Sequence, residues 1–262
     1  MNISIIIVNY RGKGLTLNCL KSIKEADWAG LSYEIIVVDN SINEHLGDIL
    51  AWQYKEVKFI QNKTNLGMGA GNNLGISRAQ GEYVVIMNHD TIAMRDTFRK
   101  LYDYMEANPK VGVVGPKQFN PDKTVQSSCF RWHGLLTPIW RRTFLGVRFG
   151  ARDMQRFMMS DFDKNSIREV DWLLGSFLFI RGSALKQVGG FDERFFLYFE
   201  DTDLCRRFHQ KNWQVVFNPE AEIIHNHGRA SARTPWYKFF TNYTTRAHVM
   251  SWIKYLIKWR FK

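Results

Sequence analysis

Short apolar runs alternate with helical patterns along the N-terminal part of this chain, and this alternation constrains its fold more than any other feature. The runs cover residues 3–10, 33–40, 57–61 and 83–87. The first is almost continuously apolar, which is typical of a strand buried on both faces, and we predict that the other three are further buried strands. Helical spacing of apolar residues follows at 15–23 and again at 72–79. Strands alternating with helices predict an α/β fold with a doubly wound, mostly parallel sheet.

Polar residues stand at the carboxyl ends of several of these runs. Asn9 ends the first, Asp39 and Asn40 end the second, and Asn88 and Asp90 follow the fourth. Strand ends are polar in many proteins because loops are hydrated, so each of these residues alone is weak support. In open α/β sheets, however, ligands bind beyond the carboxyl ends of the strands. Together these residues therefore predict a site for a polar ligand at one sheet edge.

A cluster of carboxylates follows the aromatic run at residues 195–199. Glu200, Asp201 and Asp203 lie within four positions, and Leu204 and Phe208 have the i, i+4 spacing of a buried helix face. One interpretation is a general base held at a helix start beside aromatic walls. The other is an N-cap with favourable helix-dipole charge. This segment alone leaves both interpretations open.

The glycine-rich segment at residues 65–73 differs from a dinucleotide-binding fingerprint. Gly67, Gly69 and Gly71 give G-x-G-x-G, and Asn72 stands where the third glycine of the fingerprint belongs. The segment also follows the third predicted strand rather than the first. We therefore do not predict a dehydrogenase. Glycines before a helix still allow backbone to approach a ligand, and a helix N-terminus favours a diphosphate.

Composition places limits on the class of protein. With 262 residues and 45% hydrophobic content, the chain can bury one full core with an elaborated C-terminal half. The sequence has no recognisable signal peptide and no apolar run long enough to span a bilayer. Cys19, Cys129 and Cys205 are odd in number and lack metal-site spacing. They predict free thiols in a reducing cytoplasm.

The net charge of +11 is concentrated in two segments. Residues 129–156 carry six arginines and one aspartate, and residues 236–262 carry six lysines or arginines and no acid. The second segment also has an apolar stripe at helical spacing, formed by Trp236, Phe239, Phe240, Tyr243, Ala247, Met250, Ile253 and Ile257. A basic helix with bulky apolar residues predicts contact with an anionic membrane surface. A helix packed on the domain with a solvated basic face is the alternative. Nucleic-acid binding is not predicted, because no nucleic-acid motif accompanies these segments.

The chain resembles glycosyltransferase family 2 in the order of its short motifs. These are VNY at 8–10, VDN at 38–40, NLGMGAGNN at 65–73, NHD at 88–90, WLLGSFLFIR at 172–181, YFEDTDLCRR at 198–207 and HNHG at 225–228. The resemblance covers residues 1–230 and is strongest to bacterial rhamnosyltransferases of O-antigen and cell-wall synthesis. It implies a GT-A fold, a nucleotide-diphospho-sugar donor, inversion of the anomeric centre, and Mg²⁺ or Mn²⁺. We expect a nucleotide-sugar-binding half at 1–120, a catalytic half at 121–230, and a membrane-associating segment with amphipathic helices at 231–262.

The resemblance also implies roles for individual residues. The nucleotide and diphosphate would be bound by Asn9, Asp39, Asn40, Asn65, Gly67 and Asn72, with Asp39 on the pyrimidine ring. Asp201 matches the catalytic base, and Asp90 and His225 match metal-holding positions. The sugar and acceptor would lie near Gly175, Ser176 and Glu200.

One position departs from the family pattern. Residue 88 is Asn where the family's metal motif has Asp, so weaker metal binding is expected, although many rhamnosyltransferases of this group look similar. His225 and His227 would point to opposite faces of a strand end, so only one should reach the metal. We favour His225.

These observations predict an inverting, metal-assisted rhamnosyltransferase. It would use dTDP-L-rhamnose and a polyprenyl-diphosphate-linked saccharide at the cytoplasmic face of the bacterial cell membrane, in O-antigen or cell-surface polysaccharide synthesis. The alternatives are a UDP-sugar donor on the same fold, a sugar-phosphate nucleotidyltransferase, and a non-catalytic nucleotide-binding membrane protein.

Overall fold

A computed structural model describes residues 1–42, 44–141, 144–226 and 242–260. Within these residues, ten strands form one mixed sheet in the order β3-β2-β1-β4-β11-β6-β12-β5, with β7 on β6 and β9 on β12, and β8 pairs with β10 in a small ribbon. The strands are β1 (Ile3–Asn9), β2 (Tyr33–Asp39), β3 (Lys58–Gln61), β4 (Tyr83–Met87), β5 (Thr91–Ala93), β6 (Val111–Phe119), β7 (Val125–Gln126), β8 (Cys129–Phe130), β9 (Arg168–Glu169), β10 (Trp172–Leu173), β11 (Phe177–Arg181) and β12 (Gln214–His225).

The N-terminal half is a parallel sheet, as the apolar runs predict. β1 pairs in parallel with β2 and β4, and β2 pairs in parallel with β3. Every residue of β1 is buried, which explains why its sequence is continuously apolar. Asn9 lies directly opposite Asp39 in the register, so the polar ends of β1 and β2 are level.

The C-terminal half joins this sheet through one antiparallel strand. β11 lies between β4 and β6 and is antiparallel to both, whereas β12 runs parallel to β6. The sheet is therefore mixed, and the predicted α/β class is confirmed. This insertion brings Ser176, which precedes β11, beside Asn88, which follows β4: the Asn88 N–H donates to the Ser176 carbonyl at 2.9 Å.

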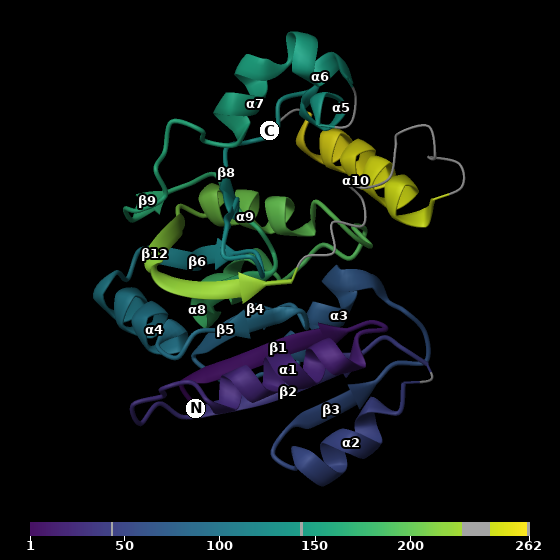
Figure 1. The fold of residues 1–262 in the computed structure, drawn as a ribbon, viewed down its shortest axis with the longest axis vertical. Coiled ribbons are helices and arrows are strands. Elements are labelled where there is room, and N and C mark those ends of the chain that lie inside the picture. Colours follow the sequence, from purple (N-terminus) through teal and green to yellow (C-terminus); the bar gives the residue numbers. More distant parts are fainter. Residues whose placement is uncertain (43, 142–143, 227–241, 261–262) are drawn as a thin grey trace.

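Helices cover both faces of the sheet. They are α1 (Lys13–Lys24), α2 (Leu46–Gln53), α3 (Gly67–Ile76), α4 (Thr97–Ala107), α5 (Thr137–Trp140), α6 (Phe144–Phe149), α7 (Ala151–Phe157), α8 (Gly182–Val188), α9 (Glu200–Gln210) and α10 (Tyr243–Trp259). The core on one face includes α1 and α4, and the cores on the other include α3, α8 and α9 (Figure 1). Cys19, Cys129 and Cys205 are free and buried in these layers, which confirms the prediction of free thiols.

The helix after β3 begins earlier than the sequence pattern predicts. α3 starts at Gly67, so the glycines lie inside the helix rather than before it. Gly67 has a φ of +82°, and a Cβ there would lie 2.4 Å from the Phe196 carbonyl oxygen. A Cβ at Gly75 would lie 2.4 Å from the side chain of Ile6. The glycines therefore permit close packing of α3 against β1 and the 195–199 segment.

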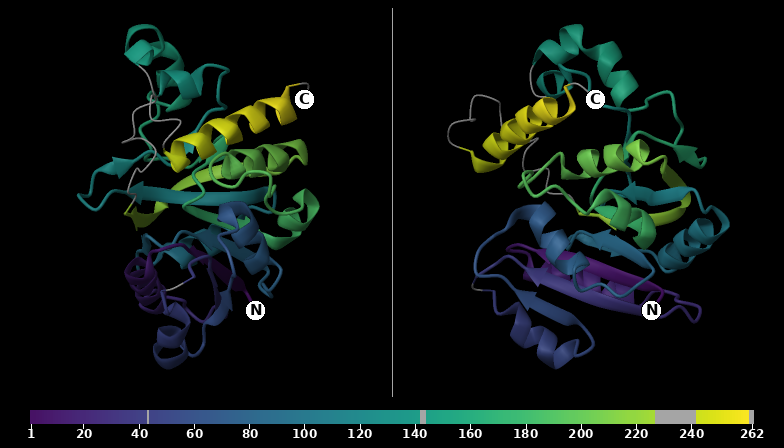
Figure 2. Two further views of the ribbon diagram at one scale, coloured as in Figure 1. Left: turned by 90° about the vertical axis from the view of Figure 1, so that its right-hand side faces the viewer. Right: turned by 180° about the vertical axis from the view of Figure 1, so that it is seen from behind.

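The short helices α5, α6 and α7 form a cap at the end of the molecule far from β2 and β3, and α10 lies in the same half (Figures 1 and 2). α10 packs on the segment before α9, where Tyr255 and Trp259 form a cluster with Phe195 and Phe199. Lys258 extends from α10 to the carboxylate of Asp203 at 2.6 Å. The C-terminal helix is thus part of the folded domain.

Four residues of the apolar stripe predicted for the C-terminal segment are exposed in the structure, whereas Ala247 is half-buried. Tyr243, Met250, Ile253 and Ile257 are 54%, 49%, 42% and 71% exposed. Trp236, Phe239, Phe240 and the expected boundary at residue 230 lie outside the described residues. In the described ranges no helix combines the length and apolarity that crossing a bilayer requires.

Candidate active site

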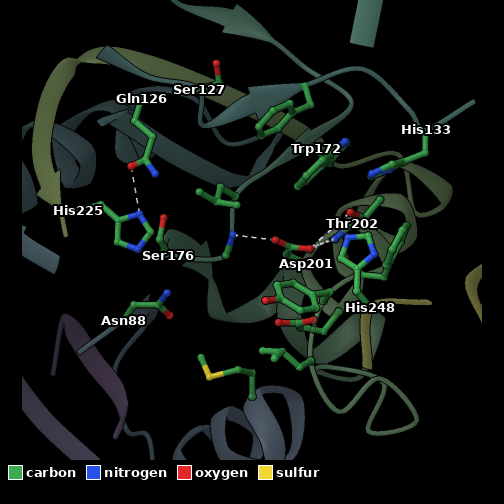
Figure 3. A pocket seen from close by; sticks show the side chains of 18 of the residues that line it. Asn88, Gln126, Ser127, His133, Trp172, Ser176, Asp201, Thr202, His225 and His248 are labelled. Carbon is green, nitrogen blue, oxygen red and sulfur yellow. Dashed lines mark hydrogen bonds between the residues drawn. The ribbon is translucent and has the colours of Figure 1, made fainter. Parts of the chain in front are cut away.

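A cavity of about 510 Å³ lies between the central strands and the cap (Figure 3). Six of the predicted site residues line it: Asn72, Gly175, Ser176, Glu200, Asp201 and His225. The predicted residues that do not line it are Asn9, Asp39, Asn40, Asn65, Gly67 and Asp90. The sequence motifs of the catalytic half therefore meet at one cavity, whereas five of the six expected nucleotide residues do not line it.

Asp201 is held in this cavity by backbone donors. Its Oδ2 accepts a hydrogen bond from the Gly175 N–H at 2.9 Å, and its Oδ1 accepts from the Thr202 N–H at 2.7 Å. A Cβ at Gly175 would lie 3.1 Å from the Asp201 Cβ, so a side chain there would crowd this contact. Burial raises the pKa of Asp201, and the two backbone hydrogen bonds oppose that rise. The result is an oriented carboxylate with increased basicity.

Glu200 shares the first turn of α9 but has a different environment. Its Oε2 is buried and has no hydrogen-bond partner among the residues described. Burial, followed by the charge of Asp201, raises the pKa of Glu200 well above its usual value. The preceding residues Tyr198 and Phe199 have φ values of +68° and +67°. Non-glycine residues rarely adopt this conformation, and such strain is concentrated at functional sites.

A second polar group lies across the cavity from Asp201. The His225 Nε2 is 3.3 Å from the Asp90 Oδ1, and its Nδ1 is 3.1 Å from the Gln126 Oε1. The Oδ1 of Asn88 is buried and lacks a hydrogen-bond partner in the described part of the chain. Figure 3 shows Asn88 and His225 on the same side of the cavity.

The side chains of Asp90, His225 and Asn88 are suitable ligands for a hard divalent cation. A carboxylate, an imidazole and an amide oxygen are suitable ligands, and Mg²⁺ or Mn²⁺ commonly takes its remaining ligands from water and substrate phosphates. No cluster of three or more His, Cys, Asp or Glu side chains suited to a metal occurs among the described residues. Among the described residues, the candidate ligands are thus Asp90, His225 and the amide oxygen of Asn88. His227, the alternative to His225, lies outside the described residues.

Asp39 and Asn9 meet at the ends of β2 and β1. The Asp39 Oδ1 accepts from the Asn9 Nδ2 at 2.8 Å and from the Ser41 N–H at 2.9 Å. The Asn9 side chain also accepts from Thr16 and donates to Glu44, so its hydrogen-bonding groups are used within the protein. In contrast, the Asp39 Oδ2 is buried without a hydrogen-bond partner in the described chain.

Asn40 and Asn65 connect the adjoining loops. The Asn40 side chain donates to the Gly67 carbonyl at 3.2 Å and accepts from Asn62 at 2.7 Å. The Asn65 Oδ1 accepts from the Gly67 N–H at 2.9 Å. These contacts make the two asparagines organisers of the α3 N-terminus.

Sequence reasoning missed several residues that line the cavity. Gln126, His133 and His248 line it without being part of any motif singled out from the sequence. The ring of His133 is enclosed by Phe157, Trp172 and Phe199, and burial lowers its pKa to about 3, so it is neutral near pH 7. His248 comes from α10, and its ring lies 4.9 Å from that of Tyr198. In the sequence, only the position of His248 relative to the apolar stripe of the helix could have indicated which way its side chain points.

A family model described as Glycosyl transferase family 2 matches residues 4–164, more than half of the 262-residue chain. The chain belongs to glycosyltransferase family 2. It is a glycosyltransferase, which confirms the resemblance drawn from the order of its motifs.

Two curated relatives of this glycosyltransferase are rhamnosyltransferases. It is 29% identical over 220 residues to an N-acetylglucosaminyl-diphospho-decaprenol L-rhamnosyltransferase of Mycobacterium tuberculosis, covering 77% of this chain and 69% of that protein. It is 26% identical over 266 residues to rhamnosyltransferase WbbL of Escherichia coli K12, covering 98% and 93%.

Solved structures of low sequence identity share its fold. Mannosyltransferase PcManGT from Pyrobaculum calidifontis, solved with GDP-Man and Mn²⁺, matches with a TM-score of 0.63 at 17% identity, over 98% of this chain and 64% of that chain. S. aureus TarS 1–349, solved with UDP-GlcNAc, matches with a TM-score of 0.61 at 17% identity, over 89% and 61%. The predicted GT-A fold is confirmed.

Proposed function

We propose that this glycosyltransferase transfers L-rhamnose from dTDP-L-rhamnose to a polyprenyl-diphosphate-linked saccharide, with inversion at the anomeric carbon. The observation that carries the proposal is Asp201, a buried carboxylate held by two backbone N–H groups inside the cavity. The rhamnosyltransferase relatives support the sugar, and the acceptor named for the mycobacterial relative supports the lipid diphosphate.

In this mechanism, Asp201 is the general base. Its carboxylate takes the proton of an acceptor hydroxyl while that oxygen bonds to the anomeric carbon. The bond from the anomeric carbon to the donor diphosphate breaks in the same step, and the nucleoside diphosphate leaves with the electron pair. The backbone donors from Gly175 and Thr202 keep the carboxylate oriented toward the acceptor. The raised pKa of Asp201 makes it a stronger base than an exposed aspartate.

Asp90 and His225, with the Oδ1 of Asn88, would hold Mg²⁺ or Mn²⁺. When bound, such an ion neutralises negative charge on the departing diphosphate. Gln126 contacts the His225 Nδ1 and thereby orients the imidazole toward Asp90.

The buried Oδ2 of Asp39 is an acceptor suited to the ring N–H of a pyrimidine. Asn9 fixes the other carboxylate oxygen, so the side chain is oriented before a nucleotide binds. Thymine and uracil carry the same ring N–H, so this contact alone admits both dTDP and UDP donors.

We further propose that the protein associates with an anionic membrane through α10. The exposed face of this helix carries the apolar residues Met250, Ile253 and Ile257 among the exposed basic residues Arg246, Lys254 and Arg260. Such a face favours binding at a lipid headgroup boundary. Lys258 is not part of this face, because it is ion-paired with Asp203 in the interior.

A donor panel tests the proposed activity. Purified protein is incubated with Mg²⁺ or Mn²⁺, a synthetic lipid-diphosphate-GlcNAc acceptor, and dTDP-L-rhamnose, UDP-GlcNAc, UDP-glucose or GDP-mannose in turn. We expect transfer from dTDP-L-rhamnose alone, with nucleoside diphosphate released. Transfer from a UDP-sugar would correct the donor, inorganic diphosphate release would indicate a nucleotidyltransferase, and nucleotide binding without turnover of any donor would contradict catalysis.

A further inference from the structure

A second hollow, of about 490 Å³, is lined largely by α7 and the segment that follows it. Four arginines line it, and we call it the arginine pocket: Arg131, Arg152, Arg156 and Arg168. Phe130 lines the catalytic cavity, and Arg131, the next residue in the chain, lines the arginine pocket. The two spaces therefore lie near each other at this point of the chain.

The charge of this pocket is largely uncompensated. Asp161 is the one carboxylate residue among the described residues that line it. Arg131 pairs with the Asp171 Oδ1 at 3.3 Å, and the Arg168 guanidinium lies 4.8 Å from the centre of the Phe162 ring.

Arg152 and Arg156 are exposed on α7, and neither forms an ion pair with any described carboxylate. Gathering like charges is unfavourable unless an anion offsets the repulsion. The arrangement is therefore that of an anion site.

The geometry of guanidinium groups identifies the kind of anion. Each presents a planar fork of N–H donors that matches two oxygens of a phosphate group. The volume of the hollow is within the range of small-molecule sites, which leaves room for a phosphate or diphosphate.

Exposed apolar side chains in the cap that carries Arg152 and Arg156 indicate where this phosphate comes from. Leu135, Leu136 and Phe149 are 66%, 42% and 69% exposed in the cap that α7 shares with α5 and α6 (Figure 1). Isolated exposed apolar residues need no explanation, but several in the same cap as an arginine cluster match an amphiphile with a phosphate head and hydrocarbon tails.

We propose that the arginine pocket binds the phosphate group of a membrane lipid. The inference rests on the proposed membrane association, and it adds a specific headgroup site to the general attraction of α10. Because the adjacent residues Phe130 and Arg131 line the two spaces, a lipid phosphate bound in the arginine pocket would keep the catalytic cavity near the membrane surface.

Vesicle flotation tests the proposal with two double variants of the full chain. R152Q/R156Q removes two exposed pocket arginines, and R78Q/R95Q removes two exposed arginines elsewhere. Each protein is mixed with two kinds of phosphatidylcholine vesicle. One kind contains phosphatidylglycerol, which carries a phosphate, and the other contains oleate, which carries a carboxylate, in an amount that gives the same charge. On phosphatidylglycerol we expect R152Q/R156Q to bind about 30-fold more weakly than wild type, and R78Q/R95Q to bind unchanged. Wild type should prefer phosphatidylglycerol to oleate, and inorganic pyrophosphate should displace it.

Three results would overturn the proposal. Equal losses in both variants, or equal binding to phosphate and carboxylate vesicles, would indicate non-specific attraction. Pyrophosphate binding to the pocket without an effect of R152Q/R156Q on vesicles would indicate a free phosphate ligand instead of a lipid. Glycosyl transfer is measured separately on wild type without vesicles, so a failure of the proposed activity leaves the binding result intact.

Discussion

At the scale of single residues, the three carboxylates at the start of α9 have three different environments. Asp201 faces the cavity between two backbone donors, whereas Glu200 has a buried oxygen without a partner in the described chain. Asp203 is fully buried and pairs with Arg207 at 2.9 Å and Lys258 at 2.6 Å. The sequence allowed either a catalytic or a structural interpretation of this cluster. The geometry favours a structural role for Asp203 and a catalytic role for Asp201.

Asp201→Asn should lower transfer by about 10²- to 10⁴-fold while donor affinity stays near normal. The amide keeps the shape of the side chain but cannot accept the acceptor proton. Initial rates and donor titration calorimetry measure the two effects separately. Asp163→Asn, at an exposed position, serves as the control. Turnover like that of wild type would remove Asp201 from the mechanism and leave Glu200 as the candidate base.

Glu200→Gln should raise the free energy of unfolding, more at pH 8 than at pH 5. The pKa of Glu200 is raised in the folded state by burial and then by the charge of Asp201. Such a group adds to the free energy of unfolding when the pH is below its pKa in the unfolded chain. This contribution is lost as the pH rises through its pKa in the folded protein. Gln cannot ionise, so it avoids that loss. Urea unfolding at both pH values, with the exposed Glu25→Gln as control, checks this. An equal gain at both pH values would contradict it.

At the scale of elements, α10 is joined to the catalytic half by a buried charge cluster. Lys258 bonds to Asp192 at 2.7 Å and Asp203 at 2.6 Å, and the Trp259 Nε1 donates to Asp203 at 2.9 Å. The same helix contributes His248 to the cavity. The position of α10 therefore affects the catalytic site directly.

Lys258→Gln should destabilise the protein by about 2 kcal/mol, because Asp203 would keep its buried charge with one cation fewer. Urea unfolding measures the loss. Arg246→Gln, on the exposed face of the same helix, should change stability little. Equal effects of the two substitutions would show that the charge cluster does not anchor α10.

The double substitution Ile253→Ser and Ile257→Ser should weaken binding to anionic vesicles, by about tenfold for each apolar side chain removed. Both are exposed in the protein alone, so their loss removes membrane contact rather than core packing. Vesicle sedimentation at low and high salt measures the change, and Ile42→Ser, 69% exposed in the N-terminal half, is the matched control. Unchanged binding would leave α10 as a structural helix.

At the scale of the whole molecule, the sheet brings the expected metal ligands together from distant parts of the chain. Asp90 lies between β4 and β5, and His225 ends β12, yet their side chains meet at 3.3 Å. β12 pairs with β5 through His225 and Thr91, which positions the two residues.

Asp90→Ala and chelation of the wild type should have the same effect, weaker donor binding and slower transfer, because the diphosphate loses its cation. Donor titration calorimetry with and without Mn²⁺ measures the binding, with Asp163→Ala as control. Full activity of the wild type in excess EDTA would contradict a metal role. Phosphate binding would then rest on basic side chains and helix N-termini.

The sequence by itself determined the four N-terminal strands, the start of α9 at its carboxylates and the level polar ends of β1 and β2. β1, β2 and β4 follow from burial of a continuous apolar run. The prediction was wrong about the burial of β3, whose end residues Lys58 and Gln61 are exposed. The sequence did not determine where α3 begins, because its glycines are explained by contacts with Phe196 and Ile6.

Only the tertiary structure decided which separate segments meet in the cavity. Gln126 lines it because β7 pairs with β6, and His248 lines it because α10 docks on the 195–199 segment. It also decided that Lys258 is an interior anchor while Ile257 is exposed. Contacts between residues far apart in the chain leave no periodic signal in a single sequence, so packing alone determines them.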